Sequence, residues 1–381
     1  MEVENFTYDG RIELIVGPMF SGKSNELLRR MRRFEISGKK TLLIKYSEEN
    51  KEPIEKEFCT HDGLCKNAFW IDQIFIMEKN AKQVDVVGVD DGQFFPDLDD
   101  FAEKMANQGK IVIVAGLDAT FERKPFDSIV SLIPKSEKLD KLLAVCAVSE
   151  KDAAFSKRRT NETQEKVLGG TDKYLAVSRQ QWFQKGKSEK EVDEKKEADL
   201  NFQGEIQLIL GPMFGGKTSE LIRRMRRYRI AQKKCLMLKY NKDTRYTKQF
   251  CTTHDHVTFE AMQCGSYLSA VKEIVADYDV IGVDEGQFFL DVVQFVEDLA
   301  NKGKIVVVAG LDGTFERKPF GNFLNLVPLA ESVCKLNAVC VKTFKEAPFT
   351  RRISEEKEIE VIGGIDKYAA VSRKAFFQKD F

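Results

Sequence analysis

Several features are missing from the 381-residue sequence, and each absence excludes a class of protein. Lysine plus arginine and aspartate plus glutamate both number 60, so no net charge attracts nucleic acid or a membrane surface. No apolar run reaches the roughly 18 residues of a membrane span. The polar, acidic start of the sequence does not resemble a signal or transit peptide. We therefore expect a cytoplasmic protein with no membrane and no nucleic-acid partner.

The cysteines also lack a recognisable pattern. Eight cysteines are present, and no two of them form a C-x-x-C pair. The sequence therefore predicts neither a disulfide framework nor a four-sulfur metal site. We expect the cysteines to be reduced and mostly buried.

What the sequence does contain is one long internal repeat. Gly17 and Gly211 lie 194 positions apart, as do Asp90 and Asp284. Residues 116–126 recur with a single change as residues 310–320. Solenoid repeats span about 20 to 50 residues, so this longer period predicts a domain duplicated in tandem.

A charged segment separates the two copies. Residues 185–199 consist largely of lysine and glutamate and contain almost no apolar side chains, so they cannot bury a core. We place one domain at residues 1–184, a linker at residues 185–203 and a second domain at residues 204–381. Each domain has an ordinary size for an independent core.

The most specific motif is a glycine-rich loop that occurs once in each copy. Residues 17–24 and 211–218 both fit G-x-x-x-x-G-K-[ST], each after an apolar run and before a helical pattern. In such loops the backbone N–H groups surround phosphate, the lysine reaches the β- and γ-phosphates, and the hydroxyl holds Mg²⁺. A chance glycine-rich turn is less favoured because the motif occurs twice in this context. The predicted ATP-binding residues of the second copy are Gly211, Pro212, Met213, Phe214, Gly215, Gly216, Lys217 and Thr218.

Strands and helices alternate along the second copy, and the first copy repeats the pattern. We expect strands at residues 206–210, 235–238, 280–283 and 305–309, and helices at residues 217–231 and 290–301. Strands that are almost entirely apolar predict a parallel sheet with helices on both faces, an α/β fold of the P-loop (RecA-like) class. After Glu122 and Glu316 the pattern becomes irregular, which leaves roughly 60 residues per copy for a smaller lobe.

Two acids follow the third of these strands. Asp284 and Glu285 stand where the carboxyl end of a parallel strand meets the phosphate loop. Asp284 is placed to orient Mg²⁺ with Thr218, and Glu285 to take a proton from an attacking hydroxyl. The alternative is a solvated strand end, which the loop upstream disfavours.

The helix after each loop is rich in arginine. This could line a nucleic-acid groove, but few aromatic residues accompany the arginines and the net charge is zero. A solvated or subunit-facing surface is favoured. The residues are Arg29, Arg30, Arg32 and Arg33 in the first copy, and Arg223, Arg224, Arg226, Arg227 and Arg229 in the second.

Taken in this order, the motifs resemble those of the type II, cytosolic thymidine kinases. The matching segments are residues 211–218, 242–246, 284–289, 312–320 and 360–368, which cover nearly all of the second copy, and the first copy matches more loosely. The tandem arrangement resembles the fused thymidine kinases of trypanosomatids. The resemblance implies phosphorylation of the thymidine 5′-hydroxyl to dTMP by MgATP in pyrimidine salvage, with deoxyuridine as a second substrate and dTTP as a feedback inhibitor.

The resemblance also implies roles for individual residues. Glu285 is the expected general base, with Asp243 and Arg245 near the site of phosphoryl transfer. Thr218 and Asp284 serve Mg²⁺. Thymidine binding is assigned to a pocket and a lasso loop formed by Met213, Leu311, Phe315, Phe320, Thr350, Ile359, Val361, Gly363 and Tyr368.

One departure from the family concerns zinc. The family carries a structural zinc on four cysteines, and the matching positions here are Cys340, Thr343, Ser372 and Ala375, or Cys146, Ser149, Ser178 and Gln181 in the first copy. One sulfur cannot hold a tetrahedral structural zinc, so we expect no zinc site.

A second departure separates the copies. The first copy has Asp91 for Glu285, Glu49 for Asp243, Lys51 for Arg245 and Glu165 for Ile359. These changes shorten the base, replace a forked guanidinium by a point charge and add an acid near an apolar pocket, and a misplacement of about 1 Å can cost roughly 10²-fold in rate. We therefore expect a catalytic second domain and a degenerate first domain that acts as a built-in subunit of a pseudo-dimer, with further self-association open. The alternatives are two active copies, a first copy that senses nucleotide, and an ATPase coupled to nucleic acid.

Overall fold

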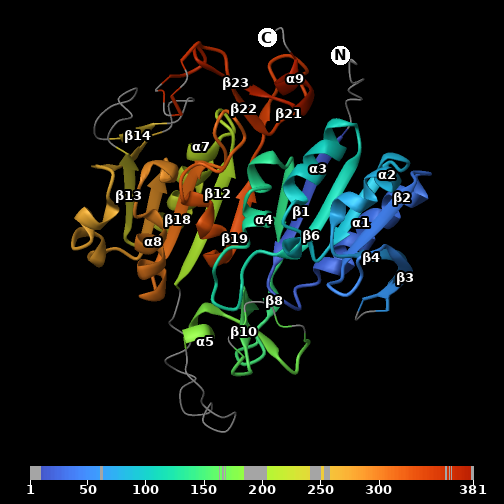
Figure 1. The fold of residues 1–381 in the computed structure, drawn as a ribbon. Coiled ribbons are helices and arrows are strands. Elements are labelled where there is room, and N and C mark those ends of the chain that lie inside the picture. Colours follow the sequence, from blue (N-terminus) through green and yellow to red (C-terminus); the bar gives the residue numbers. More distant parts are fainter. Residues whose placement is uncertain are drawn as a thin grey trace.

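The computed structural model describes residues 10–60, 63–162, 164, 167, 169–183, 204–240, 250–252, 258–356, 358–359, 361 and 363–378. In this part of the chain thirteen strands form one large sheet (Figure 1). From the centre outward, the first half (residues 10–183) contributes β7 (Lys138–Lys141), β1 (Arg11–Gly17), β6 (Ile111–Leu117), β5 (Val86–Asp90), β2 (Thr41–Tyr46), β4 (Cys65–Ile71) and β3 (Ile54–Cys59). The second half (residues 204–378) contributes β19 (Ser332–Lys335), β12 (Glu205–Gly211), β18 (Ile305–Leu311), β17 (Val280–Asp284), β13 (Cys235–Tyr240) and β16 (Met262–Cys264).

The sheet is mostly parallel, as the apolar strand pattern predicts. β1 pairs in parallel with β6 and β7, and β12 pairs in parallel with β18 and β19. β5 and β17 are buried along their whole length, because helices cover both faces. The four strands expected in the second half are confirmed, with ends that differ by at most two residues.

Alternate side chains of each strand face different helix layers. On one face, α1 (Lys23–Ile36) packs Leu27 and Met31 against Ile15, and α7 (Lys217–Ile230) occupies the same place in the second half. On the other face lie α3 (Leu98–Asn107), whose Phe101 packs in the cluster that holds Ile12, and α8 (Val292–Asn301). The shorter helices are α2 (Glu78–Lys82), α4 (Asp127–Val130), α5 (Arg179–Phe183) and α9 (Arg373–Phe377), and the 3₁₀ turns are η1 (Ile74–Met77), η2 (Gly92–Phe94), η3 (Ile133–Lys135), η6 (Leu268–Val271), η7 (Ile274–Asp277), η8 (Gly286–Phe288) and η9 (Phe323–Leu329).

The two halves join at the middle of the sheet. β7 and β19 pair in antiparallel fashion, with Cys334 opposite Asp140. The largest hydrophobic cluster contains side chains of both halves, including Leu132 and Ile133 from the first and Val327 from the second. The sheet and part of the core therefore continue across the junction.

Each half also carries a small lobe, and the two lobes lie at opposite ends of the molecule (Figure 1). The first lobe contains β8 (Ala144–Val145), β9 (Asp152–Ala153), β10 (Phe155–Arg158), β11 (Tyr174–Val177) and α5, and the second contains β20 (Ala338–Val339), β21 (Glu346–Ala347), β22 (Phe349–Arg352), β23 (Tyr368–Val371) and α9. Beside the sheet of the second half, β14 (Phe250–Thr252) pairs with β15 (Thr258–Glu260). The predicted linker, residues 185–203, lies outside the described residues.

One expectation about the cysteines is wrong. Cys59 and Cys65 form a disulfide and are both exposed, whereas the spacing pattern predicts reduced cysteines. The reason is the β3–β4 hairpin, which places the two residues directly opposite each other with Cα atoms 4.1 Å apart. A bilayer would need a longer and more apolar helix than any in the described part of the chain.

Candidate active site

The glycine-rich loop between β12 and α7 has two glycines in backbone conformations that other residues rarely adopt. Gly211 has a φ of +145°, and a Cβ there would lie 2.4 Å from the Leu336 carbonyl oxygen, so only glycine fits. Gly216, with a φ of +76°, leads into α7 at Lys217. The Lys217 ammonium donates to the Pro212 carbonyl oxygen at 2.6 Å. Because the first N–H groups of a helix have no partner within it, this geometry suits an anion.

Three carboxylates lie near enough to the Lys217 ammonium to act on its charge. Burial lowers the pKa of Lys217, and the charges of Glu285, Asp312 and Asp284 oppose that shift without cancelling it. A lysine whose pKa is lowered while several acids act on it is the kind of perturbed group that clusters at binding and catalytic sites.

The residues predicted to hold Mg²⁺ lie together. Asp284 ends β17 and is buried, and the Thr218 hydroxyl on the first turn of α7 donates to it, with O···O distances of 3.1 and 3.2 Å. Hydroxyl and carboxylate oxygens are the ligands that Mg²⁺ prefers. The donor set therefore fits that ion.

Glu285 follows directly and has an unusual backbone. Its φ is +59°, a left-handed conformation that is uncommon outside glycine. The Gln287 side-chain amide donates to Glu285 Oε2 at 2.7 Å, and its own oxygen accepts from the Leu311 N–H at 3.0 Å. Gln287 thereby ties the Glu285 carboxylate to the end of β18. Backbone strain held in place by such contacts is common at functional sites.

A group of residues predicted to bind thymidine connects the loop to the small lobe. The Met213 N–H donates to the Thr350 hydroxyl at 2.9 Å. The Arg352 guanidinium lies 4.0 Å from the Phe315 ring centroid and donates to the Tyr368 hydroxyl at 2.7 Å. These contacts bring β12, β22 and β23 to one place.

Two described residues of the lasso segment, Ile359 and Val361, are held through their backbone carbonyl oxygens. The Tyr368 hydroxyl donates to the Val361 carbonyl oxygen at 2.8 Å, and Arg352 donates to the Ile359 carbonyl oxygen at 3.2 Å. The Ile359 side chain is 58% exposed, so the backbone of this residue, and not its side chain, is what the structure ties to the site. Gly363 lies on the same segment.

The remaining predicted residues divide into two groups. The Leu311 N–H donates a hydrogen bond to the Gln287 side-chain oxygen. Phe320 packs edge-on against Phe288, with ring centroids 5.5 Å apart. Asp243 and Arg245 lie outside the described residues.

The first half contains a cavity of about 560 Å³ at the equivalent place, hereafter the first-half cavity. Lys23 and Ser24 of its glycine-rich loop line one side, together with Asp90 and Asp91. The lining also includes the counterparts of eight of the nine predicted thymidine-binding residues: Met19, Leu117, Phe121, Phe126, Ser156, Val167, Gly169 and Tyr174.

The carboxylates of the first-half cavity have a basic partner. Lys45 Nζ lies 2.7 Å from Asp90 and 2.5 Å from Asp91. Burial lowers the pKa of Lys45, but the two carboxylates outweigh it and raise that pKa overall. The ion pair therefore holds Asp91, the counterpart of Glu285, against a permanently charged ammonium.

Comparison with known proteins agrees with this geometry. The family model described as thymidine kinase matches residues 10–182 and residues 204–376. The human cytosolic thymidine kinase is 59% identical over 177 residues, which are 46% of this chain and 75% of the human protein. The thymidine kinase of vaccinia virus (strain Ankara) is 59% identical over 173 residues, which are 45% of this chain and 97% of the viral protein. This chain belongs to the thymidine kinase family. It is an enzyme that phosphorylates thymidine.

Where other members of the kinase family are expected to carry zinc ligands, this kinase has a small packed core. Cys340 is buried among alanines and Phe349, and the Thr343 and Ser372 hydroxyls lie 3.2 Å apart. Burial raises the pKa of the Cys340 thiol, but hydrogen bonds from Thr343 and from nearby backbone N–H groups lower it to about 7. Side-chain packing and short polar contacts thus hold the four matching positions.

Two residues of the kinase site escaped the sequence analysis. Gln287 stands inside the motif of residues 284–289, and its spacing of two from Glu285 was the available signal. Arg352 is one of many arginines in the sequence. Only the structure shows that its guanidinium lies over the Phe315 ring and donates to the Tyr368 hydroxyl.

Proposed function

We propose that the second half of this kinase transfers the γ-phosphoryl group of ATP to the 5′-hydroxyl of thymidine, and that deoxyuridine is a second substrate. The observation that carries the proposal is the cluster of Lys217, Asp284 and Glu285 around the glycine-rich loop. The cluster combines a cation for phosphate, an acid for a metal ion and an acid for a proton. A kinase needs these three roles within a few ångströms of one transferring group.

The chain's own groups divide the work of the reaction. The loop N–H groups and Lys217 bind and orient the triphosphate. Glu285, aimed by Gln287, accepts the proton of the 5′-hydroxyl as that oxygen attacks phosphorus. Thr218 and Asp284 would hold Mg²⁺, which supplies charge neutralisation for the phosphates. Asp243 and Arg245 are proposed to lie near the transferring phosphoryl group.

The lasso segment accounts for base selection. Arg352 holds its backbone at Ile359 and Tyr368 holds it at Val361, which supports a fixed register of backbone N–H and C=O groups against the 4-oxo and 3-NH groups of thymine. Cytosine reverses that pattern, and each mismatched buried polar pair costs about 1 to 3 kcal/mol. Phe315, covered by Arg352 on one face, offers a ring for stacking.

The first half is proposed to act as a non-catalytic subunit within one chain. The junction supports this because its contacts occur in pairs, as at an interface between two copies of one protein. Lys335 pairs with Asp312 and donates to the Ile133 carbonyl oxygen, and at the matching place Lys141 donates to the Val327 carbonyl oxygen. In the same way Arg179 reaches Glu331, and Arg373 reaches Glu137. The domains proposed are residues 1–184 and 204–381, joined by the linker at residues 185–203.

An ATPase coupled to nucleic acid receives less support. Arg30 is buried and paired with Glu13, Glu26 and Asp140. Arg224 pairs with Glu220 in the second half. These arginines are thus engaged within the chain rather than presented to a phosphate backbone. A cytoplasmic location and inhibition by dTTP belong to the same proposal as the thymidine kinase reaction.

The proposal is tested by ADP release from the full-length protein. We expect release that requires both thymidine and Mg²⁺, proceeds with deoxyuridine and is close to background with deoxycytidine. ADP release that does not depend on nucleoside, or that DNA stimulates, would contradict it.

A further inference from the structure

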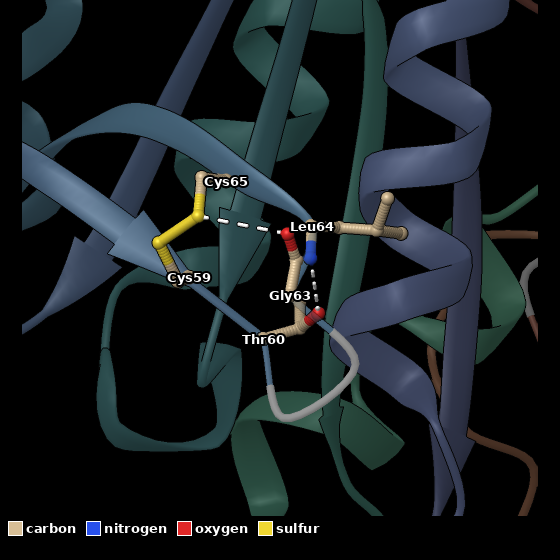
Figure 2. Close-up of a disulfide and its surroundings, with 5 residues drawn as sticks. All are labelled: Cys59, Thr60, Gly63, Leu64 and Cys65. Atoms are coloured by element: carbon tan, nitrogen blue, oxygen red, sulfur yellow. Dashed lines mark hydrogen bonds between the residues drawn. A yellow bond between two sulfur atoms is a disulfide. The ribbon is translucent and has the colours of Figure 1, made fainter.

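The Cys59–Cys65 disulfide closes the end of the β3–β4 hairpin (Figure 2). Both cysteines are exposed, so a small thiol can reach the bond. The turn has contacts of its own: the Leu64 N–H donates to the Thr60 hydroxyl at 3.3 Å, and the Cys65 sulfur lies 3.7 Å from the Gly63 carbonyl oxygen. A reduced Cys65 thiol could donate to that oxygen, so the hairpin can accommodate either redox state.

The same hairpin forms part of the wall of the first-half cavity. Phe58, Cys59 and Thr60 are among the residues that line the cavity. Lys45 Nζ lies 4.4 Å from the centroid of the Phe58 ring. The same ammonium forms ion pairs with Asp90 and Asp91. One of the two bonded sulfurs thus belongs to a residue that lines the cavity, and the ring of its neighbour Phe58 lies against the Lys45 ammonium, which also lines it.

The matching hairpin of the second half has no cysteine at the paired position. In the β14–β15 hairpin, Cys251 lies opposite Phe259, where the first half has Cys59 opposite Cys65. The hairpins therefore differ in the residue opposite the first cysteine, and the second hairpin has two more residues between the paired positions. This difference confines any effect of thiol chemistry at this position to the first half.

We propose that Cys59 and Cys65 form a reversible thiol–disulfide site that tunes nucleotide binding in the first-half cavity. In the disulfide form Phe58, Cys59 and Thr60 are already ordered along the cavity, so this form binds nucleotide more tightly. Reduction releases the two ends of the turn and adds the cost of ordering Phe58, Cys59 and Thr60 to each binding event. Disulfides of cytosolic proteins are commonly transient and redox-sensing, which suits an exposed pair of this kind.

The chemistry needs only a small thiol and its disulfide. A thiolate such as that of glutathione attacks one cysteine sulfur, the S–S bond breaks, and the other cysteine leaves as a thiolate that takes a proton. A second thiol then displaces the first cysteine from the mixed disulfide. In total two small thiols become one small disulfide, and the two cysteines gain two electrons and two protons.

The test measures nucleotide binding to the full chain in both redox states. Lys217→Ala removes the phosphate-binding lysine of the second half, so that calorimetry with Mg·dTTP reports the first-half cavity. This choice of nucleotide rests on the proposed function, whereas the redox state is read separately by mass spectrometry of the intact protein. We expect the oxidised protein to bind at least about fivefold more tightly than the reduced protein, the lower end of ordinary coupling between sites.

Two further variants in the same background make the result specific. With Cys65→Ser added, binding should stay at the reduced level whatever the small-molecule redox state. With Cys251→Ser added, the redox response should persist. Equal affinities in the two states, a response that survives Cys65→Ser, no binding in either state, or failure of the disulfide to form would each overturn the proposal. None of these outcomes alters thymidine-dependent ADP release by the wild-type chain, so the two proposals fail separately.

Discussion

The Gln287 amide donates to the Glu285 carboxylate at 2.7 Å while its oxygen accepts from the Leu311 N–H. Gln287→Glu keeps a side-chain oxygen that can accept from the Leu311 N–H. It replaces the amide NH₂ group that donates to Glu285 with a carboxylate oxygen, so that two carboxylates face each other. We expect kcat to fall about 10- to 100-fold with little change in the KM for thymidine, because a misaimed base loses transition-state stabilisation.

The pH–rate profile separates this role from a structural one. A carboxylate beside Glu285 makes it harder to ionise, so the acidic limb of the profile should move to higher pH. Gln93→Glu is the matched control, since Gln93 accepts from Leu117 in the first half in the same way. It should leave the profile where it is. An unmoved acidic limb in Gln287→Glu would show that Gln287 does not act through Glu285.

The junction predicts a large loss of stability from a single substitution. The side chains of Lys335 and Asp312 are almost fully buried, with a distance of 2.5 Å between Nζ and Oδ2. Lys335→Met leaves that carboxylate without its cation, and breaking a buried pair costs about 3 to 5 kcal/mol in the free energy of unfolding. Lys141→Met should cost a similar amount because Lys141 pairs with Asp118 at the matching place.

An exposed pair supplies the control for this measurement. Lys318 and Glu316 lie on the surface, and Lys318→Met should change the free energy of unfolding by less than about 0.5 kcal/mol. Urea unfolding of the three variants checks the order. Losses of the same size for Lys335→Met and Lys318→Met would mean that the buried Lys335–Asp312 pair beside the junction contributes little.

Local pattern and long-range contact explain what the sequence could and could not predict. Lys217, Asp284 and Glu285 were predictable because each follows a strand within a short motif, and parallel strands place such ends together. The hydrogen bond from Lys335 to the Ile133 carbonyl oxygen depends on how two segments far apart in the sequence pack together. No local sequence pattern predicts such a contact. The disulfide was missed for a related reason: its cysteines are six positions apart and meet only because a hairpin folds between them.

Zinc content provides a further prediction. We expect well under one zinc per chain, because Cys340 alone offers sulfur among the four matching positions of the second half. Glu57, Cys59 and Cys65 could together hold a metal ion if the disulfide were reduced. Elemental analysis of wild type and of the Cys59→Ser/Cys65→Ser variant distinguishes the sites. Stoichiometric zinc that persists in the double variant would mean that the lobe around Cys340 binds metal after all.

The central claim is that Glu285 of the second half, and not Asp91 of the first, accepts the proton of thymidine. The direct measurement is thymidine-dependent ADP release by two full-length variants, Glu285→Gln and Asp91→Asn. We expect the first to lower kcat by about 10² to 10⁴ with the KM for ATP nearly unchanged, since a missing general base affects the transition state. The second should stay within about twofold of wild type, because Asp91 serves an ion pair with Lys45. Comparable losses in both variants, or a large loss in Asp91→Asn alone, would contradict the account.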